Sequence, residues 1–177
     1  MERSPEKIRA PGAGTSAAQR AQKADPAVYS QMRRLALEAQ LPNVAHGGVH
    51  VVLMDWHADK GTVTVVAAAD GSASLYLSTG GGYFGGSEKA PAIREAALHA
   101  IALATSLRCH FERTDASPLP SLGDVTFYIN TGARVSCAVA AESRLRAGAD
   151  PLAGLSGAMQ RILTEYRLNL GRPGNKA

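Results

Sequence analysis

Hydrophobic and polar residues recur along the chain with two periods, and the change from one period to the other marks the expected elements. Asp25-Pro26 is typical of a helix start, with Asp as the N-cap and Pro at the first helical position. Hydrophobic residues then recur at helical spacing, at Val28, Met32, Leu35 and Leu37. We predict an amphipathic helix that ends near Leu41-Pro42. Its polar face, turned toward water, is expected to hold Arg33, Arg34 and Glu38.

Three strand-like runs follow, over residues 49–56, 62–69 and 72–78. The dipeptide Asp70-Gly71 separates the second run from the third and is a strong signal for a two-residue hairpin turn. In the third run Ala73, Leu75 and Leu77 alternate with more polar residues, which indicates one buried and one polar face. The hairpins predict an antiparallel meander.

The second half of the chain is expected to hold a helix, a hairpin and a last helix. After Ser87 and Pro91, which are predicted to open the first of these helices, small and hydrophobic residues recur at helical spacing: Ile93, Ala96, Ala97, Ala100, Ile101, Ala104 and Leu107. Residues 112–123 are predicted to form a loop, and residues 124–130 and 134–141 a hairpin. Asp150-Pro151 repeats the N-cap-plus-proline start and predicts a helix to about Leu170.

These elements predict a single α+β domain over residues 26–170, in which a five-stranded antiparallel sheet (a three-strand meander plus a hairpin) packs against three helices. The element order resembles that of profilin-like and roadblock/longin-type domains, although the middle helix comes one strand later than in roadblock domains. Such small antiparallel sheets are often used for dimerisation and partner binding, so the resemblance implies an interaction role. Residues 1–25 and 171–177 are predicted to be flexible tails, and the first of them holds almost no large hydrophobic residue.

Composition indicates the kind of surface this domain has and the compartment in which it is expected. The 177 residues carry a net charge of +4, with the excess toward both ends and no run of consecutive basic residues, which favours a solvated surface. The sequence has no secretory h-region and no hydrophobic segment long enough to span a membrane. Cys109 and Cys137 lack CxxC spacing; a single disulfide is one alternative, but two buried free thiols in a reducing compartment are favoured. We therefore expect a cytoplasmic protein.

The richest motif is the glycine-rich stretch of residues 78–87. It matches the dinucleotide pattern GxGxxG, but the strand before it belongs to a hairpin rather than to a parallel βαβ unit. It is not a P-loop, because Ser87-Glu88 stands where Lys-Ser/Thr is required. A strand-to-helix corner, an anion nest and a partner-contact loop remain open. The candidate contact residues for a ligand or partner are Gly80, Gly81, Gly82, Tyr83, Phe84, Gly85, Gly86 and Ser87.

The remaining polar residues do not form a catalytic or metal-binding pattern. Among the ligand-type side chains at His46, His50, Asp55 and His57, the period of two lets at most Asp55 and His57 converge, which is too few for a zinc site. Cys109 and His110 are adjacent and point apart. Nucleic acid is not an expected partner, because the arginines late in the chain do not fall on one helical stripe. These arginines are Arg144, Arg146, Arg161 and Arg167.

The sequence thus favours a non-enzymatic interaction or scaffold domain that associates with itself or with a protein partner as a homodimer or homo-oligomer. No cofactor, metal or membrane partner is expected. The alternative is a domain, possibly an enzyme, that binds an anion or a nucleotide at the glycine-rich loop of residues 80–86.

Overall fold

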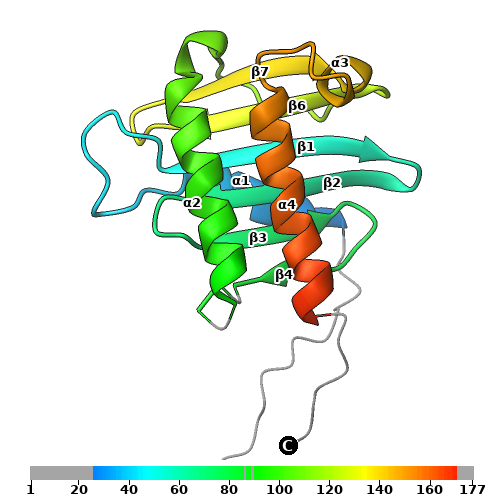
Figure 1. Cartoon of the computed structure of the whole chain (residues 1–177), viewed down its shortest axis with the longest axis horizontal. Helices are drawn as coiled ribbons and strands as arrows, with labels where there is room; N and C mark the ends of the chain where they lie inside the picture. Colours follow the sequence, from blue (N-terminus) through cyan, green and yellow to red (C-terminus); the bar gives the residue numbers. More distant parts are fainter. Residues whose placement is uncertain (1–25, 86, 89, 171–177) are drawn as a thin grey trace, which may run out of the picture.

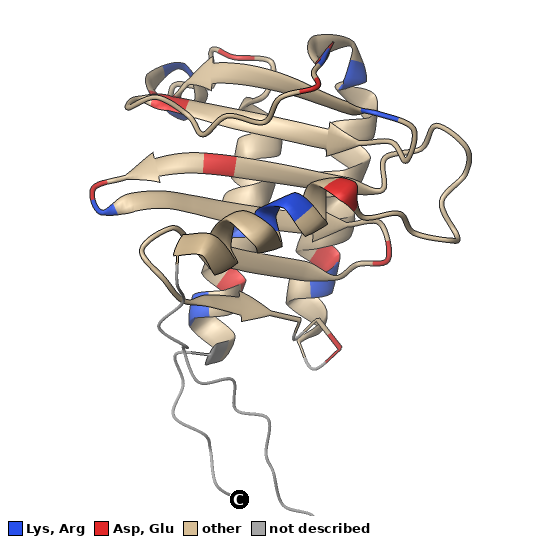
Figure 2. Cartoon of the chain, turned by 180° about the vertical axis from the view of Figure 1, so that it is seen from behind, with Lys and Arg blue, Asp and Glu red and all other residues tan. Residues whose placement is uncertain are grey.

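A computed structural model describes residues 26–85, 87–88 and 90–170; the predicted tails at 1–25 and 171–177 lie outside them. The fold is α+β, with two long helices on one face of an antiparallel sheet and a third on the other (Figures 1 and 2). The helices are α1 (Pro26–Glu38), α2 (Pro91–Ser106), α3 (Glu142–Arg146) and α4 (Ala153–Leu170), with a 3-10 turn η1 (Arg108–His110). The strands are β1 (Val51–Ala58), β2 (Gly61–Ala68), β3 (Ala73–Leu77), β4 (Gly82–Phe84), β5 (Glu112–Arg113), β6 (Asp124–Asn130) and β7 (Val135–Ala141).

The sheet is built from the predicted meander and the predicted hairpin, and its strand order is β4-β3-β2-β1-β6-β7-β5. All of its neighbouring strands are antiparallel. The Asp70-Gly71 turn forms as expected, because the Asp70 carboxylate accepts the Ser72 N–H at 2.8 Å and Gly71 has a φ of +82°. β1 and β6 pair at the centre, so the hairpin joins the meander there.

Within the described residues the sheet has seven strands rather than the five expected from the sequence. β4 arises within the glycine-rich stretch, and β5 within the segment predicted to be a loop. They contain three and two residues, which is too short for an alternating pattern to show. Both therefore become strands only because a longer neighbour, β3 or β7, pairs with them.

The helices also differ from the expectation. The described part of the chain contains four α-helices rather than three, because α3 forms directly after β7 and buries Leu145. α2 begins at Pro91 with Ala90 as its N-cap, so Ser87 does not open it. α4 begins at Ala153, and Asp150-Pro151 forms the turn before it, where the Asp150 carboxylate accepts the Leu152 N–H at 3.0 Å. None of the helices in the described part of the chain has the length and hydropathy that a bilayer crossing requires.

The α1 helix presents a different stripe to the sheet from the one expected. Its buried residues are Tyr29, Arg33 and Leu37, which recur every four residues. Val28 and Leu35 are instead 43% and 49% exposed. The prediction that Arg33 faces water is therefore wrong, because the sheet beneath offers this side chain a buried partner.

Two hydrophobic layers hold the helices on the sheet. The larger lies under α2 and α4, where alanines of α2 allow close approach of helix and sheet and Phe127, Met159 and Ile162 fill the space. The smaller lies under α1 and includes Leu53 and Tyr128. Successive residues of the central strands thus face the two layers in turn.

Candidate functional site

The first half of the glycine-rich stretch forms the turn of the β3–β4 hairpin. The Gly80 N–H donates to the Leu77 carbonyl at 2.9 Å, and the Leu77 N–H donates to the Gly81 carbonyl at 3.1 Å. Gly80 and Gly81 have φ values of +102° and +91°, in the region that favours glycine. These contacts give both glycines a structural role in the hairpin.

The second half of the stretch lies on the sheet edge. Gly82 passes so close to β3 that a Cβ there would lie 2.5 Å from the Leu75 carbonyl oxygen. Tyr83 stacks on Tyr166 of α4, with ring centroids 5.7 Å apart. Phe84 contacts Tyr76 on the opposite face, with centroids 5.3 Å apart, and is 38% exposed.

Tyr166 ties this edge to α4. Its hydroxyl lies 2.6 Å from the Ala73 carbonyl and 2.8 Å from the Gly85 carbonyl, so it can donate to either strand segment. Burial raises the pKa of Tyr166, and the charge of Tyr76 adds to the shift. Gly86 lies outside the described residues, and Ser87 is buried before α2. A ligand or partner contact at residues 80–87 stays a prediction.

The structure also contains a buried polar network that the sequence did not indicate. Asp55, completely buried in β1, receives hydrogen bonds from Arg33 Nε at 2.8 Å and Arg33 Nη2 at 2.5 Å on Oδ2, and from Thr64 at 2.5 Å on Oδ1. The Thr64 hydroxyl also hydrogen-bonds Tyr29 of α1 at 2.8 Å. Three donated hydrogen bonds make Asp55 the acceptor of an ion pair inside the fold.

Arg33 also reaches the loop that follows β5. Its Nη1 donates to the Ser117 carbonyl at 2.7 Å and its Nη2 to the Pro118 carbonyl at 3.3 Å, while its guanidinium lies 5.0 Å from the centre of the Tyr128 ring. The Tyr128 hydroxyl donates to the same Pro118 carbonyl at 2.6 Å. One guanidinium thus joins α1, β1 and the loop.

The charges of this network follow from burial and pairing. Burial raises the pKa of the Asp55 carboxyl, against the opposing hydrogen bonds from Arg33 and Thr64. Burial alone would lower the pKa of Arg33, but its hydrogen bonds and the Asp55 charge outweigh that effect and leave the pKa raised. Both Asp55 oxygens are occupied by protein donors, so this buried charge is both paired and hydrogen-bonded.

The histidines lie apart from this network. His46 is exposed, and His50 Nδ1 accepts the Leu41 N–H at 2.8 Å at the end of the α1 connection. Within the described residues, no three His, Cys, Asp or Glu side chains come together in a way that could hold a metal ion. Cys109 and Cys137 are both free thiols, one exposed and one half-buried.

The late arginines are mostly paired. Arg144 lies 3.7 Å from Asp150, Arg146 2.5 Å from Glu142 and Arg161 3.7 Å from Glu165. The arginine side chains of these pairs are mostly exposed, whereas the carboxylates are mostly covered, and the arginines lie on two different helices, α3 and α4. Each of these three guanidinium groups therefore has a carboxylate beside it.

The far end of β7 extends beyond its short outer neighbour, β5. β5 pairs with Ser136 and Cys137, and beyond them the described residues place no further strand beside residues 138–141. We call the outer side of residues 138–141 the open edge. Val139, at its centre, is 62% exposed.

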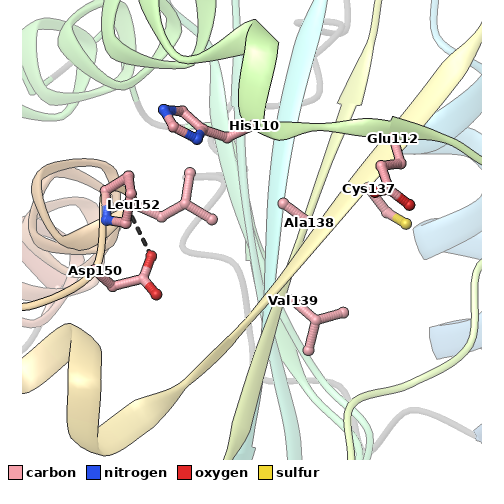
Figure 3. A pocket seen from close by; sticks show the side chains of 8 residues that line it. His110, Glu112, Cys137, Ala138, Val139, Asp150 and Leu152 are labelled. Atoms are coloured by element: carbon pink, nitrogen blue, oxygen red, sulfur yellow. Dashed lines mark hydrogen bonds between the residues drawn. The ribbon is translucent and has the colours of Figure 1, made fainter.

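A hollow of about 400 Å³ lies along the open edge. In Figure 3, Ala138 points to the side of β7 where His110, Asp150 and Leu152 lie, and Val139 points to the other side. The edge of the strand itself lies between these two groups, where a neighbouring strand would hydrogen-bond. Among the described residues, no strand pairs with β7 at this position.

The sequence did not indicate this site, because an edge is defined by strand order rather than by composition. The run Ala138-Val139-Ala140-Ala141 looks like any short strand. Its lack of charge is the one signal visible in the sequence, since exposed edges commonly carry Lys or Pro. Comparison of the chain with protein-family models, curated proteins and solved structures finds no match.

Proposed function

We propose that this chain is a small interaction domain that associates with itself rather than a catalyst. The observation that carries the proposal is the open edge of β7, where Val139 is 62% exposed and an uncharged stretch of strand lies without a neighbour among the described residues. The unpaired backbone groups of an edge strand are a template for pairing with another chain.

The chemistry of the open edge supports this reading. Proteins that avoid edge-to-edge association place Lys, Pro or a bulge on their edge strands. Residues 138–141 are three alanines and one valine, and they keep regular register with β6. The opposite edge of the sheet, β4, has three residues, and the hydroxyl of Tyr166 reaches the carbonyl of Gly85 directly after it.

The polar groups of the interior support an architectural rather than a catalytic role. Asp55 is enclosed and its oxygens are taken up by Arg33 and Thr64. Asp150, which borders the hollow, accepts the Leu152 N–H and lies 3.7 Å from Arg144. The element order, similar to that of profilin-like and roadblock/longin-type domains, adds support for partner binding.

Analytical ultracentrifugation of the full chain tests the proposal. We expect the weight-average mass to rise from that of a monomer toward that of a dimer as the concentration increases from micromolar to millimolar. A mass that stays monomeric over the whole range would contradict self-association.

A second candidate function is a domain, possibly an enzyme, that binds an anion or a nucleotide at the glycine-rich loop of residues 80–86. Its support is the pair of positive-φ glycines, Gly80 and Gly81, at the tip of the β3–β4 hairpin. The hairpin already uses the Gly80 N–H, and α2 begins only at Pro91, so the geometry supports this function less. Stabilisation by inorganic phosphate or ATP in a thermal-shift assay would favour it.

A further inference from the structure

We propose that His50 is a pH-sensitive latch for the connection between α1 and β1. While its imidazole is neutral, the ring holds residues 39–41 on the end of the sheet. When the ring is protonated, it releases them. The latch lies within one copy of the chain, so it does not depend on self-association.

The three residues directly after α1 are each held by a hydrogen bond that involves a side chain. Asn130 Nδ2 donates to the Ala39 carbonyl at 2.7 Å, and the Gln40 side chain donates to a carbonyl in the turn between β6 and β7 at 3.1 Å. The Leu41 N–H donates to His50 Nδ1 at 2.8 Å. The connection is therefore tied to one end of the sheet, and one of its three bonds ends on an imidazole.

The position of the His50 ring is fixed by its backbone and by close packing. The His50 N–H donates to the Asn130 carbonyl at 2.7 Å, and the His50 carbonyl accepts the Ala69 N–H at 2.9 Å. The ring lies against Gly132, where an added Cβ would come within 2.7 Å of Nε2. His50 is buried, at 8% exposed. The ring therefore offers Nδ1 to the connection from a fixed and largely covered position.

The hydrogen bond from Leu41 determines the protonation state of the latched ring. An imidazole nitrogen accepts a hydrogen bond only when it carries no proton, so the latched ring is neutral and carries its proton on Nε2. A protonated imidazole donates at both nitrogens and would oppose the Leu41 N–H with a second donor. Protonation therefore breaks this bond, and the connection has to open before both groups can reach water.

The direction of the pH dependence follows from this chemistry. A histidine in contact with water takes up its proton near pH 6.5. The open connection leaves Nδ1 free to bind that proton, whereas the latched connection occupies it, so the open form gains as the pH falls below about 6.5. The bonds at Ala39 and Gln40 involve amide groups, which do not titrate in this range, so release begins at Leu41.

The charged and titratable side chains on the elements around His50 are exposed. They are Glu38 at the end of α1, His46 in the connection, Asp70 in the turn after β2, His99 on α2 and Arg134 in the turn after β6. The carboxylates would favour a protonated ring and the arginine would oppose one, but water and salt screen these exposed charges. The covered hydrogen bond from the connection is therefore what makes this ring sensitive to pH.

Amide hydrogen exchange of the full chain, followed by NMR, tests the latch. We expect the protection factor of the Leu41 N–H to fall about tenfold between about pH 7.5 and about pH 5, the effect of losing one hydrogen bond. The Thr62 N–H is the internal control, because its acceptor, the Ser78 hydroxyl at 2.8 Å, does not titrate in this range. Unchanged protection of Leu41, or an equal fall at Thr62, would overturn the proposal.

Imidazole ¹⁵N spectra of the same protein test the state of the ring. At about pH 7.5 we expect the His50 proton on Nε2 and none on Nδ1. The opposite tautomer, or a charged ring at this pH, would rule out Nδ1 as the acceptor and would also overturn the proposal.

Two asparagine variants separate the latch from other effects of acid. In His50→Asn the amide oxygen can take the place of Nδ1 as an acceptor that does not titrate, so the protection of Leu41 should lose its dependence on pH. His46→Asn, at an exposed position of the connection, is the matched control and should show the same fall as the parent. A fall in His50→Asn as large as in the parent would contradict the latch. Should His50→Asn fail to fold, the exchange and the ¹⁵N spectra of the parent decide the question.

Discussion

At the scale of single residues, Gly82 occupies a position in β4 where the neighbouring strand leaves no room for a side chain. A Cβ there would lie 2.5 Å from the Leu75 carbonyl oxygen, which belongs to the backbone and cannot rotate away. We expect Gly82→Ala to lower the free energy of unfolding by about 1–3 kcal/mol, the usual cost of overpacking a filled site. Urea unfolding followed by circular dichroism measures the change.

Gly157 provides the matched control for that substitution. It is exposed within α4, and a Cβ there would have no atom within 4 Å. Gly157→Ala should therefore raise the free energy of unfolding by about 0.5–1 kcal/mol, because alanine loses less backbone entropy in a helix. A similar effect of the two substitutions would contradict the steric explanation for Gly82.

At the scale of elements, the ion pair between Arg33 and Asp55 fixes α1 on the sheet. Arg33→Met would leave a buried carboxylate without its counter-ion, and removal of one partner of a buried pair typically costs about 3–5 kcal/mol. The double variant Arg33→Met/Asp55→Leu should recover part of that loss, because no buried charge remains. Urea unfolding of the parent and the variants gives the free energies.

The neighbouring Arg34 is the control for this element. It lies 4.0 Å from Glu38 and both side chains are mostly exposed, so Arg34→Met should change the free energy of unfolding by no more than about 0.5 kcal/mol. If Arg33→Met were equally mild, the ion pair would not be what holds α1.

The elements also show how far sequence patterns reach. The meander and the hairpin were predictable, because their strand-like runs are five to eight residues long and Asp70-Gly71 marks a turn. β4, β5 and α3 were not, since each has five residues or fewer and depends on its neighbours. Arg33 was misplaced because a helical stripe with a charged member looks polar until its partner in another element is known.

At the scale of the whole molecule, four of the five tyrosines should make the free energy of unfolding depend on pH in the alkaline range. Burial raises the pKa of Tyr29, Tyr76, Tyr128 and Tyr166, whereas unfolded tyrosines ionise near pH 10. Above about pH 10 the unfolded chain binds fewer protons than the folded one, so stability should fall as pH rises. Tyrosinate absorbance and circular dichroism, recorded together, should change in one transition.

The variant Tyr166→Phe is the control for this alkaline transition. It removes one of the raised ionisations, so the decline of stability with pH should become less steep, whatever its effect at neutral pH. Tyrosinate that forms near pH 10 in an unchanged fold would contradict the coupling.

The candidate site belongs to this largest scale as well. Which strand ends a sheet depends on the order in which distant segments pair, and β6 and β7 pair beside β1 across more than sixty residues of chain. The sequence showed that β7 is a strand, but it could not show that one side of it is open. The glycine-rich stretch, visible at once in the sequence, proved to be a hairpin turn and an edge strand.

The contacts of Arg33 have a consequence for the order in which the protein can fold during its synthesis. α1 leaves the ribosome before the other described elements, and the meander of β1 to β4 can then form from neighbouring segments. The loop carbonyls and the Tyr128 ring that complete the surroundings of Arg33 follow 84 to 95 residues later, since the Arg33–Ser117 bond spans 84 residues and Tyr128 lies 11 beyond Ser117. α1, which is made before the other described helices, is therefore among the last of them to be fully fixed in place.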